Sequence, residues 1–174
     1  MSRRLAYLAA PLAVFAPSGY ATIYLSVEQA QQIMFPGDSF SSRAFSLTGA
    51  QRQAIEDRSN VKVRSMEQQV WKTSGGGWFV LDRVLGKHEL ITYAVGLNPD
   101  GTMRGMEILE YSENYGYQVR EAAWRKQFAG KSSADRFKLD EDIRNISGAT
   151  LSCRHVTDGV KRILATYEIA LRTN

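Results

Sequence analysis

The sequence predicts an α+β fold in which a twisted antiparallel sheet is flanked by helices. Segments rich in β-branched and aromatic residues fill the middle of the 174-residue chain and are separated by turn signals. Two short helical patterns come before them, and a long amphipathic pattern that starts at Leu151 follows. Because short turns join strands that are adjacent in sequence, we expect an antiparallel meander and a long C-terminal helix.

Two short helices are expected before the sheet, over residues 26–34 and 48–58. Each starts with Ser or Thr and carries Gln three positions later, which is the pattern of a capping box. Pro36 and Gly37 stop the first helix, and residues 38–45 between the two helices are expected to form a loop.

The expected strands are residues 61–71, 78–85, 89–97 and 103–111. The first alternates only partly and ends at residues 74–77, where three glycines favour a hairpin turn. No Lys-Thr or Lys-Ser pair and no helical pattern follows these glycines, so a phosphate-binding loop is not favoured. Asp100-Gly101 is a clear hairpin signal between the last two strands.

The C-terminal pattern predicts one long helix with a single apolar face. The positions on that face are Val156, Val160, Ile163, Leu164, Tyr167 and Leu171. Ile169 falls off this face. A shorter helix is expected over residues 118–128, between the strands and the long helix.

A turn of small residues, Ser147-Gly148-Ala149-Thr150, leads directly into the long helix. A helix start has free backbone N–H groups and the positive end of the macrodipole, so it favours an anion such as phosphate. Gly148 and Ala149 allow close backbone approach. Ser147, Thr150 and Ser152 supply three hydroxyls, any of which could cap the helix or hold a phosphate oxygen. Such clusters are also ordinary helix caps, so the turn alone leaves both interpretations open.

Residues 146–152, Ile-Ser-Gly-Ala-Thr-Leu-Ser, resemble the flavinylation motif of the FMN-binding domain family. That family includes the flavin-carrying subunits of sodium-pumping NADH:quinone oxidoreductase and of the Rnf complex. The family's Trp-x-x-x-Phe-x-Gly-Lys stretch is matched by Trp124, Phe128, Gly130 and Lys131. The resemblance covers residues 78–171 in order. It implies that Thr150 carries FMN covalently, through a phosphoester bond made by a dedicated flavin transferase.

The same resemblance aligns residues 113–116 with a Glu-Thr-Pro-Gly loop of the family. Glu113 and Gly116 are retained, whereas Asn114 and Tyr115 replace Thr-Pro. The flavin ring is expected between this loop and the sheet, and Tyr115 could tune its stacking and redox potential. The cofactor site implied by the resemblance is Ser147, Gly148, Ala149, Thr150, Leu151 and Ser152 with Glu113, Asn114, Tyr115 and Gly116.

Three aromatic side chains, those of Tyr115, Tyr117 and Trp124, are candidates for contact with the ring, although each is individually more typical of core packing. Asp142 is retained from the family pattern, but Arg144 stands where relatives often carry a second acidic residue. If the transferase reads that carboxylate, modification would be slower here or would need a different transferase. The Arg144 guanidinium could alternatively hold the phosphate.

The N-terminus has the pattern of a secretory signal over residues 1–21. Arg3 and Arg4 precede an uncharged, mostly apolar run over residues 5–15, and small residues follow, with cleavage expected after Ala21. An uncleaved anchor is the alternative, although the run is short for a membrane span. We expect one FMN-binding domain over residues 22–174, located in the periplasm, or attached to the inner membrane if the segment is not cleaved.

Charge and cysteine content narrow the function classes. Without Arg3 and Arg4, the 22 basic residues become 20 against 18 acidic ones, and they form no basic stripe that would favour nucleic acid. The single cysteine, Cys153, supports neither a disulfide framework nor a cysteine metal cluster. His88 and His155 do not form a metal-ligand pattern with nearby carboxylates, and no nucleophile–base pair or dinucleotide fingerprint is visible.

The sequence therefore favours an electron carrier over a stand-alone enzyme. In this interpretation, the protein passes electrons between membrane or periplasmic redox proteins. Two alternatives remain open: a small flavin-dependent reductase that acts directly on a soluble acceptor, and a non-redox binding or sensor module with the same fold.

Overall fold

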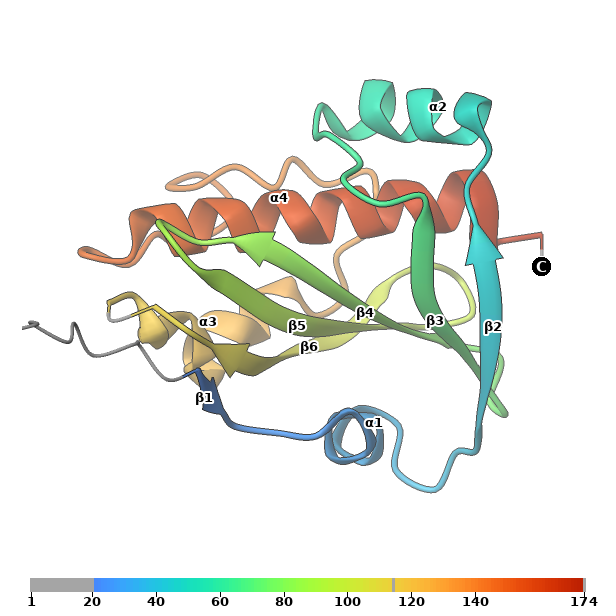
Figure 1. Ribbon diagram of the computed structural model, residues 1–174, viewed down its shortest axis with the longest axis horizontal. Coiled ribbons are helices and arrows are strands. Elements are labelled where there is room, and N and C mark those ends of the chain that lie inside the picture. The colour runs from blue at the N-terminus through green and yellow to red at the C-terminus, as the bar shows by residue number, and fades with distance from the viewer. Residues whose placement is uncertain (1–20, 114, 174) are drawn as a thin grey trace, which may run out of the picture.

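The structure, a computed structural model, describes residues 21–113 and 115–173. Over these residues, the chain forms an antiparallel sheet of order β1-β6-β5-β4-β3-β2 with helices on both faces (Figure 1). The strands are β1 (Thr22–Ile23), β2 (Phe40–Ser46), β3 (Glu67–Thr73), β4 (Trp78–Leu85), β5 (Leu90–Leu97) and β6 (Met103–Tyr111). The helices are α1 (Val27–Met34), α2 (Gly49–Ser59), α3 (Ala122–Arg125) and α4 (Thr150–Thr166). The predicted α+β class is confirmed.

Both N-terminal helices start as predicted. Ser26 Oγ accepts the Gln29 N–H at 3.1 Å, while Gln29 Oε1 accepts the Ser26 N–H at 2.8 Å. Thr48 and Gln51 form the same reciprocal pair at the start of α2. Each capping box satisfies backbone donors that would otherwise lack partners at a helix start, so local sequence defines these two helix starts.

The loop predicted over residues 38–45 is wrong, because most of this segment is the edge strand β2. It pairs with β3 from Phe40–Thr73 to Ser46–Glu67. Its side chains are mostly small and exposed on both faces, so the sequence lacks the alternation that marks a half-buried strand. The strand predicted from residue 61 starts only at Glu67, and the preceding residues connect it to α2.

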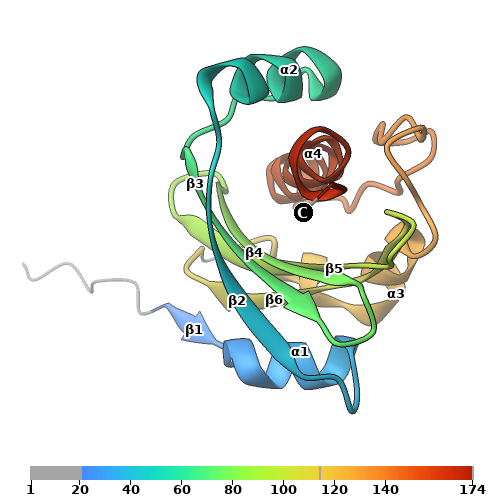
Figure 2. The same cartoon turned by 90° about the vertical axis from the view of Figure 1, so that its right-hand side faces the viewer.

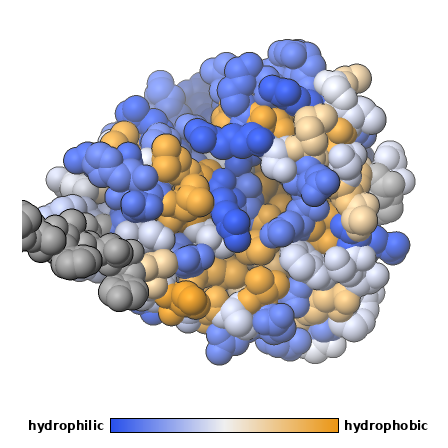
Figure 3. Space-filling view, in the orientation of Figure 1, coloured by the Kyte–Doolittle hydropathy of each residue, from blue (hydrophilic) through white to orange (hydrophobic). Residues whose placement is uncertain are grey.

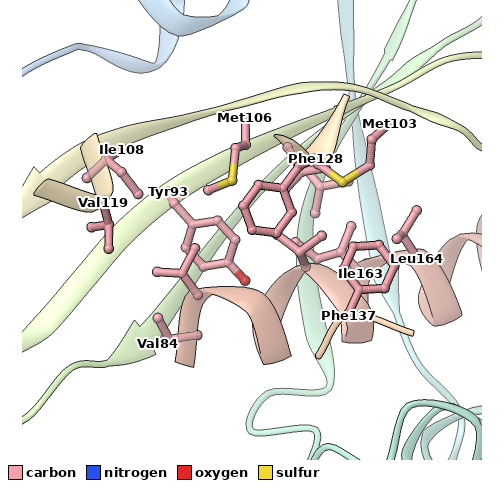
Figure 4. Packing of buried hydrophobic residues seen from close by; sticks show 14 of the residues in the cluster. Val84, Tyr93, Met103, Met106, Ile108, Val119, Phe128, Phe137, Ile163 and Leu164 are labelled. Carbon is pink, nitrogen blue, oxygen red and sulfur yellow. The ribbon is translucent and has the colours of Figure 1, made fainter. Parts of the chain in front are cut away.

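The predicted meander is confirmed from β3 to β6, with hairpin turns at residues 74–77 and 98–102. The main core lies between this sheet and α4 (Figure 4). Tyr93 and Ile108 from the strands and Ile163 and Leu164 from the helix are all at most 3% exposed. Every apolar position predicted for the helix face is buried. The helix continues beyond Thr166 as a π-helical turn over Tyr167–Leu171.

The sheet curls around α4, and α1 covers its opposite face (Figure 2). The cluster on the α1 side contains Ala30, Met34, Phe35, Phe79, Ala94 and Leu109. α2 packs on α4 through Ile55 and Ala165, with Ile169 partly buried beside them. The outer side of α2, at the top of the space-filling view, is hydrophilic (Figure 3). The sheet therefore separates two apolar layers, and α4 belongs to the larger one.

The single helix predicted over residues 118–128 is instead three short pieces: a 3₁₀ turn over Tyr117–Arg120, α3, and a 3₁₀ turn over Lys126–Phe128. Glu121 between the first two pieces is extended, with φ −61° and ψ 131°. Val119, Trp124 and Phe128 are all buried. Residues five apart in an α-helix are about 140° apart around the axis, and the break at Glu121 lets Val119 and Trp124 reach the same core cluster.

The predicted secretory signal lies outside the described residues, apart from Ala21 at its end. No helix within residues 21–113 and 115–173 has the length and apolar character needed to cross a membrane.

Candidate functional site

The start of α4 has no side-chain cap. Ala149 is the N-cap residue, so none of the hydroxyls of Ser147, Thr150 and Ser152 caps the helix. Gly148 turns the chain into the helix with φ 83°, a conformation that favours glycine. An uncapped helix start leaves backbone N–H groups available for an external acceptor, and the helix dipole favours an anion there.

Thr150 lies half-buried at this helix start, and its hydroxyl oxygen accepts a hydrogen bond from Asn145 Nδ2 at 3.2 Å. The side chain lines a cavity of about 370 Å³ between α4 and the preceding segment. That segment lies beside the first turns of α4, in orange in Figures 1 and 2. The lining residues are Phe137, Lys138, Leu139, Asp140, Asn145, Thr150, Arg154, Thr157 and Asp158. The volume falls within the range of pockets that bind small organic ligands.

Two cations and two carboxyl groups line this cavity. Arg154 is one helical turn after Thr150, and Lys138 belongs to the opposite wall. The hydrogen-bonded ion pair with Glu141 raises the pKa of Lys138, so its ammonium group stays charged at neutral pH. Burial raises the pKa of the Asp158 carboxyl. Lys138 and Arg154 are therefore the groups suited to hold a phosphate beside Thr150.

Asp142 shapes the wall of the cavity and does not line it. Its carboxylate accepts the Phe137 N–H at 3.0 Å, the Lys138 N–H at 2.6 Å and Lys131 Nζ at 3.2 Å. Burial raises the pKa of Asp142, but these hydrogen bonds together lower it below its usual value. Phe137 and Asp140 both have positive φ, at 51° and 65°. The hydrogen bonds of this carboxylate thus help to offset the backbone strain of a tightly turned segment.

Ser152 and the loop before α3 meet on the other side of α4. Tyr111 donates its hydroxyl proton to Tyr115 O at 2.5 Å and accepts one from Ser152 Oγ at 2.9 Å. Gly116 has φ 91°, and a Cβ there would lie 2.6 Å from Tyr111 Oη and 2.7 Å from Ser152 Oγ. Positions two residues apart in a helix differ by about 200° around the axis, so Ser152 points away from the cavity at Thr150.

Glu113 has a structural role in this arrangement. Its Oε1 accepts the N–H groups of His88 at 2.5 Å and Glu89 at 3.1 Å, which fixes the β4–β5 turn. Burial raises the pKa of Glu113, whereas these backbone hydrogen bonds lower it overall. Asn114, which was expected in the cofactor site, lies outside the described residues.

The three aromatic candidates do not line the cavity at Thr150. Trp124 is 4% exposed, donates to Arg144 O at 2.7 Å and contacts Phe128 edge to face, so it is a core residue. Tyr115 is 82% exposed and Tyr117 is 55% exposed. Tyr117 instead borders a separate cavity of about 580 Å³ beside β6.

The arginine that lines the cavity is Arg154 and not Arg144, which the sequence suggested. Arg144 is exposed and is absent from the cavity lining, whereas Arg154 contributes to it. Sequence reasoning missed Arg154, although its position four residues after Thr150 places both on one helix face. Leu151 is 39% exposed and lies beside Thr150 in sequence, but it does not line the cavity.

The residues around Thr150 fit a flavin nucleotide. A hydroxyl, two cations and two apolar side chains, Phe137 and Leu139, line the same space. Asn145 adds a buried carbonyl oxygen that has no hydrogen-bond partner within the described part of the chain. A ligand with phosphate oxygens, hydroxyl donors and a largely apolar ring satisfies all of these groups.

Comparison with known proteins agrees with this chemistry. Residues 86–165 match the family model of the FMN-binding domain. The chain is also similar to one subunit of the Na⁺-translocating ferredoxin:NAD⁺ oxidoreductase complex of Acetobacterium woodii, with 27% identity over 82 residues, covering 42% of this chain and 40% of the relative. The similarity therefore spans about two fifths of that relative. The residues that match the FMN-binding domain model include the α4 start and both walls of the cavity.

Proposed function

We propose that this protein is an electron carrier that holds FMN covalently through a phosphoester bond to Thr150. The observation that carries the proposal is the position of the Thr150 hydroxyl, at an uncapped helix start and in the wall of a cavity with Lys138 and Arg154. The family match supports FMN as the ligand. The similarity to a component of an oxidoreductase complex supports electron transfer as the role.

Each part of the site has a defined task in this proposal. Thr150 supplies the oxygen of the ester, while Lys138, Arg154 and the free N–H groups of α4 stabilise the phosphate charge. Phe137 and Leu139 supply apolar contact for part of the cofactor. FMN, when bound, supplies reversible uptake of electrons, which no side chain of the cavity provides. A covalent link removes dissociation, which matters where a lost cofactor would be diluted.

The proposed location is the outer side of the bacterial inner membrane. The secretory pattern of residues 1–21 supports it, as does the advantage of a covalent cofactor outside the cytoplasm. The proposed partners are a flavin transferase, which forms the ester, and membrane or periplasmic redox proteins, which exchange electrons with the flavin. If the N-terminal segment is not cleaved, it attaches the domain to the membrane.

Mass spectrometry of the full chain, co-expressed with a bacterial flavin transferase, tests the ester directly. We expect a mass increment of one FMN less water on the peptide that contains Thr150, and no increment in Thr150→Val. Thr166→Val is the matched control, because it removes a buried hydroxyl of the same helix that donates to Arg162 O. An unmodified wild-type chain with an active transferase present, or an increment that persists in Thr150→Val, would refute the proposal.

A further inference from the structure

Asn145 is the side chain that contacts the hydroxyl proposed for flavin attachment. Its Nδ2 donates to Thr150 Oγ1 at 3.2 Å, and the residue lines the same cavity. Its Oδ1 is buried and has no partner among the residues that the structure describes. A buried carbonyl oxygen without a donor is unfavourable, and most such groups in folded proteins are paired. The amide therefore has one polar atom that is hydrogen-bonded and one that has no partner.

The backbone before Asn145 is held rigidly. The Arg144 N–H donates to Gln127 Oε1 at 2.6 Å, and Arg144 O accepts from Trp124 Nε1 at 2.7 Å. Ile143 is fully buried, and Ile146 packs against the main core. Contacts before and after Asn145 thus anchor the segment, so the Asn145 amide has a defined position relative to α4. A functional group is best placed by a backbone that is fixed on both sides.

We propose that Asn145 is a positioning residue for flavin attachment. Its amide N–H holds the Thr150 hydroxyl, and its carbonyl oxygen accepts a hydrogen bond from a hydroxyl or N–H group of the incoming flavin nucleotide. This inference rests on the proposed function, because it concerns the same threonine and the same ligand. It adds to the proposed site a residue that orients the Thr150 hydroxyl for the attachment reaction.

The chemical step defines what Asn145 contributes. Thr150 Oγ1 forms a bond to the phosphorus of the FMN half of FAD, and the pyrophosphate bond of FAD breaks. AMP leaves with the bonding electron pair, and the hydroxyl proton passes to a base of the transferase or to water. A free threonine side chain samples staggered χ1 rotamers, so the bond from Asn145 keeps the nucleophile in the one that faces the cavity.

The kinetics of attachment distinguish this role from a purely structural one. The full chain is incubated with a bacterial flavin transferase and varied FAD, and the flavin fluorescence of the denatured protein is measured over time. We expect Asn145→Ala to lower kcat for attachment by about tenfold, the effect of one lost hydrogen bond. Asn98→Ala is the matched control, because Asn98 Nδ2 donates to Thr102 Oγ1 at 3.0 Å in the β5–β6 turn, and it should keep the wild-type rate.

Binding without attachment tests the carbonyl oxygen. Thr150→Val cannot form the ester, so titration of this variant with FMN reports non-covalent affinity. Adding Asn145→Ala should weaken FMN binding by roughly three- to tenfold, whereas adding Asn98→Ala should leave it unchanged. Thermal unfolding of each variant shows whether the domain remains folded at the assay temperature.

The outcomes distinguish failure of the positioning role of Asn145 from failure of the proposed attachment at Thr150. If Thr150→Val remains unlabelled but Asn145→Ala is labelled at the wild-type rate, the proposed function stands and the positioning role is refuted. The role is also refuted if Asn145→Ala slows attachment only in proportion to its unfolded fraction, or if FMN affinity does not change. If Thr150→Val is still labelled, the proposed function itself fails.

Discussion

Gly116→Ala tests how the loop before α3 is held against the helix start. Gly116 has φ 91°, which an L side chain rarely adopts. A Cβ would also lie 2.6 Å from Tyr111 Oη and 2.7 Å from Ser152 Oγ, closer than van der Waals contact allows. These two hydroxyls are hydrogen-bonded to each other, so neither moves without breaking that bond. The substitution therefore combines backbone strain with a steric clash.

The expected destabilisation follows from these two terms. Left-handed backbone at a non-glycine residue costs roughly 1–2 kcal/mol, and forcing a methyl group into filled space costs about 1–3 kcal/mol. The sum is about 2–5 kcal/mol, a large fraction of the stability of a typical domain. For a chain of this length, each kcal/mol lowers Tm by about 2–4 °C, so we expect a decrease of roughly 4–20 °C in thermal unfolding followed by circular dichroism.

Gly130→Ala separates the two terms. Gly130 also has positive φ, at 77°, but a Cβ there would meet no atom within 4 Å. It should therefore show only the backbone cost of about 1–2 kcal/mol. Removing both hydroxyls with Tyr111→Phe and Ser152→Ala should bring the cost of Gly116→Ala down to the same level. The steric reasoning is wrong if Gly116→Ala and Gly130→Ala lower Tm equally, or if removal of the hydroxyls changes nothing.

Three further predictions concern the cavity and the acid stability of the fold. Asp142→Asn removes one of the two carboxylate partners of Lys131 and weakens the turns of the segment. We therefore expect about 1–3 kcal/mol of destabilisation in urea and faster proteolysis within residues 137–142; unchanged cleavage would contradict this role. Arg154→Ala should weaken FMN binding to Thr150→Val by about tenfold and reduce its dependence on salt, while Arg154→Lys should recover part of the affinity; equal affinity would exclude a phosphate contact. The hydrogen bond from Lys62, with the Val63 N–H and Arg52, lowers the pKa of Glu56 to about 2. Its contribution to stability is therefore complete above about pH 4.3 and is lost as the pH falls toward 2, so Glu56→Gln should show a smaller decrease in urea midpoint between pH 5 and pH 2.5 than wild type.

Local signals in the sequence predicted the elements that local chemistry defines. The capping boxes of α1 and α2, the hairpin turns and the apolar face of α4 all depend on residues a few positions apart. The edge strand β2 could not be found in this way, because its pairing with β3 involves residues 21 to 33 positions away and neither face is regularly buried. The break at Glu121 depends on the requirement that Val119 and Trp124 reach the same core.

In the candidate site, too, local sequence predicts some features and long-range contacts determine the others. The motif indicates Thr150, and the structure shows that this residue lines a cavity. The family resemblance places Ser152 and Glu113 in the cofactor site with Thr150. In the structure, their hydrogen bonds hold the far side of α4 and the β4–β5 turn. Asn145 could be assigned only from the structure, because its contact depends on how the preceding turn folds back onto the helix.

The start of α4 lacks a side-chain cap, yet side-chain contacts hold its first turns in place. A helix without a cap loses about 0.5–2 kcal/mol and tends to fray. Here, side chains outside the backbone ladder hold the first turns: Ser152 contacts Tyr111, Thr150 contacts Asn145, and His155 Nδ1 lies 3.1 Å from Gly86 O, which can only accept. These side-chain contacts hold the first turns without capping the helix, so in the proposed function its first N–H groups are available to the phosphate. A side-chain cap would satisfy those donors internally and would compete with a phosphate for the same position.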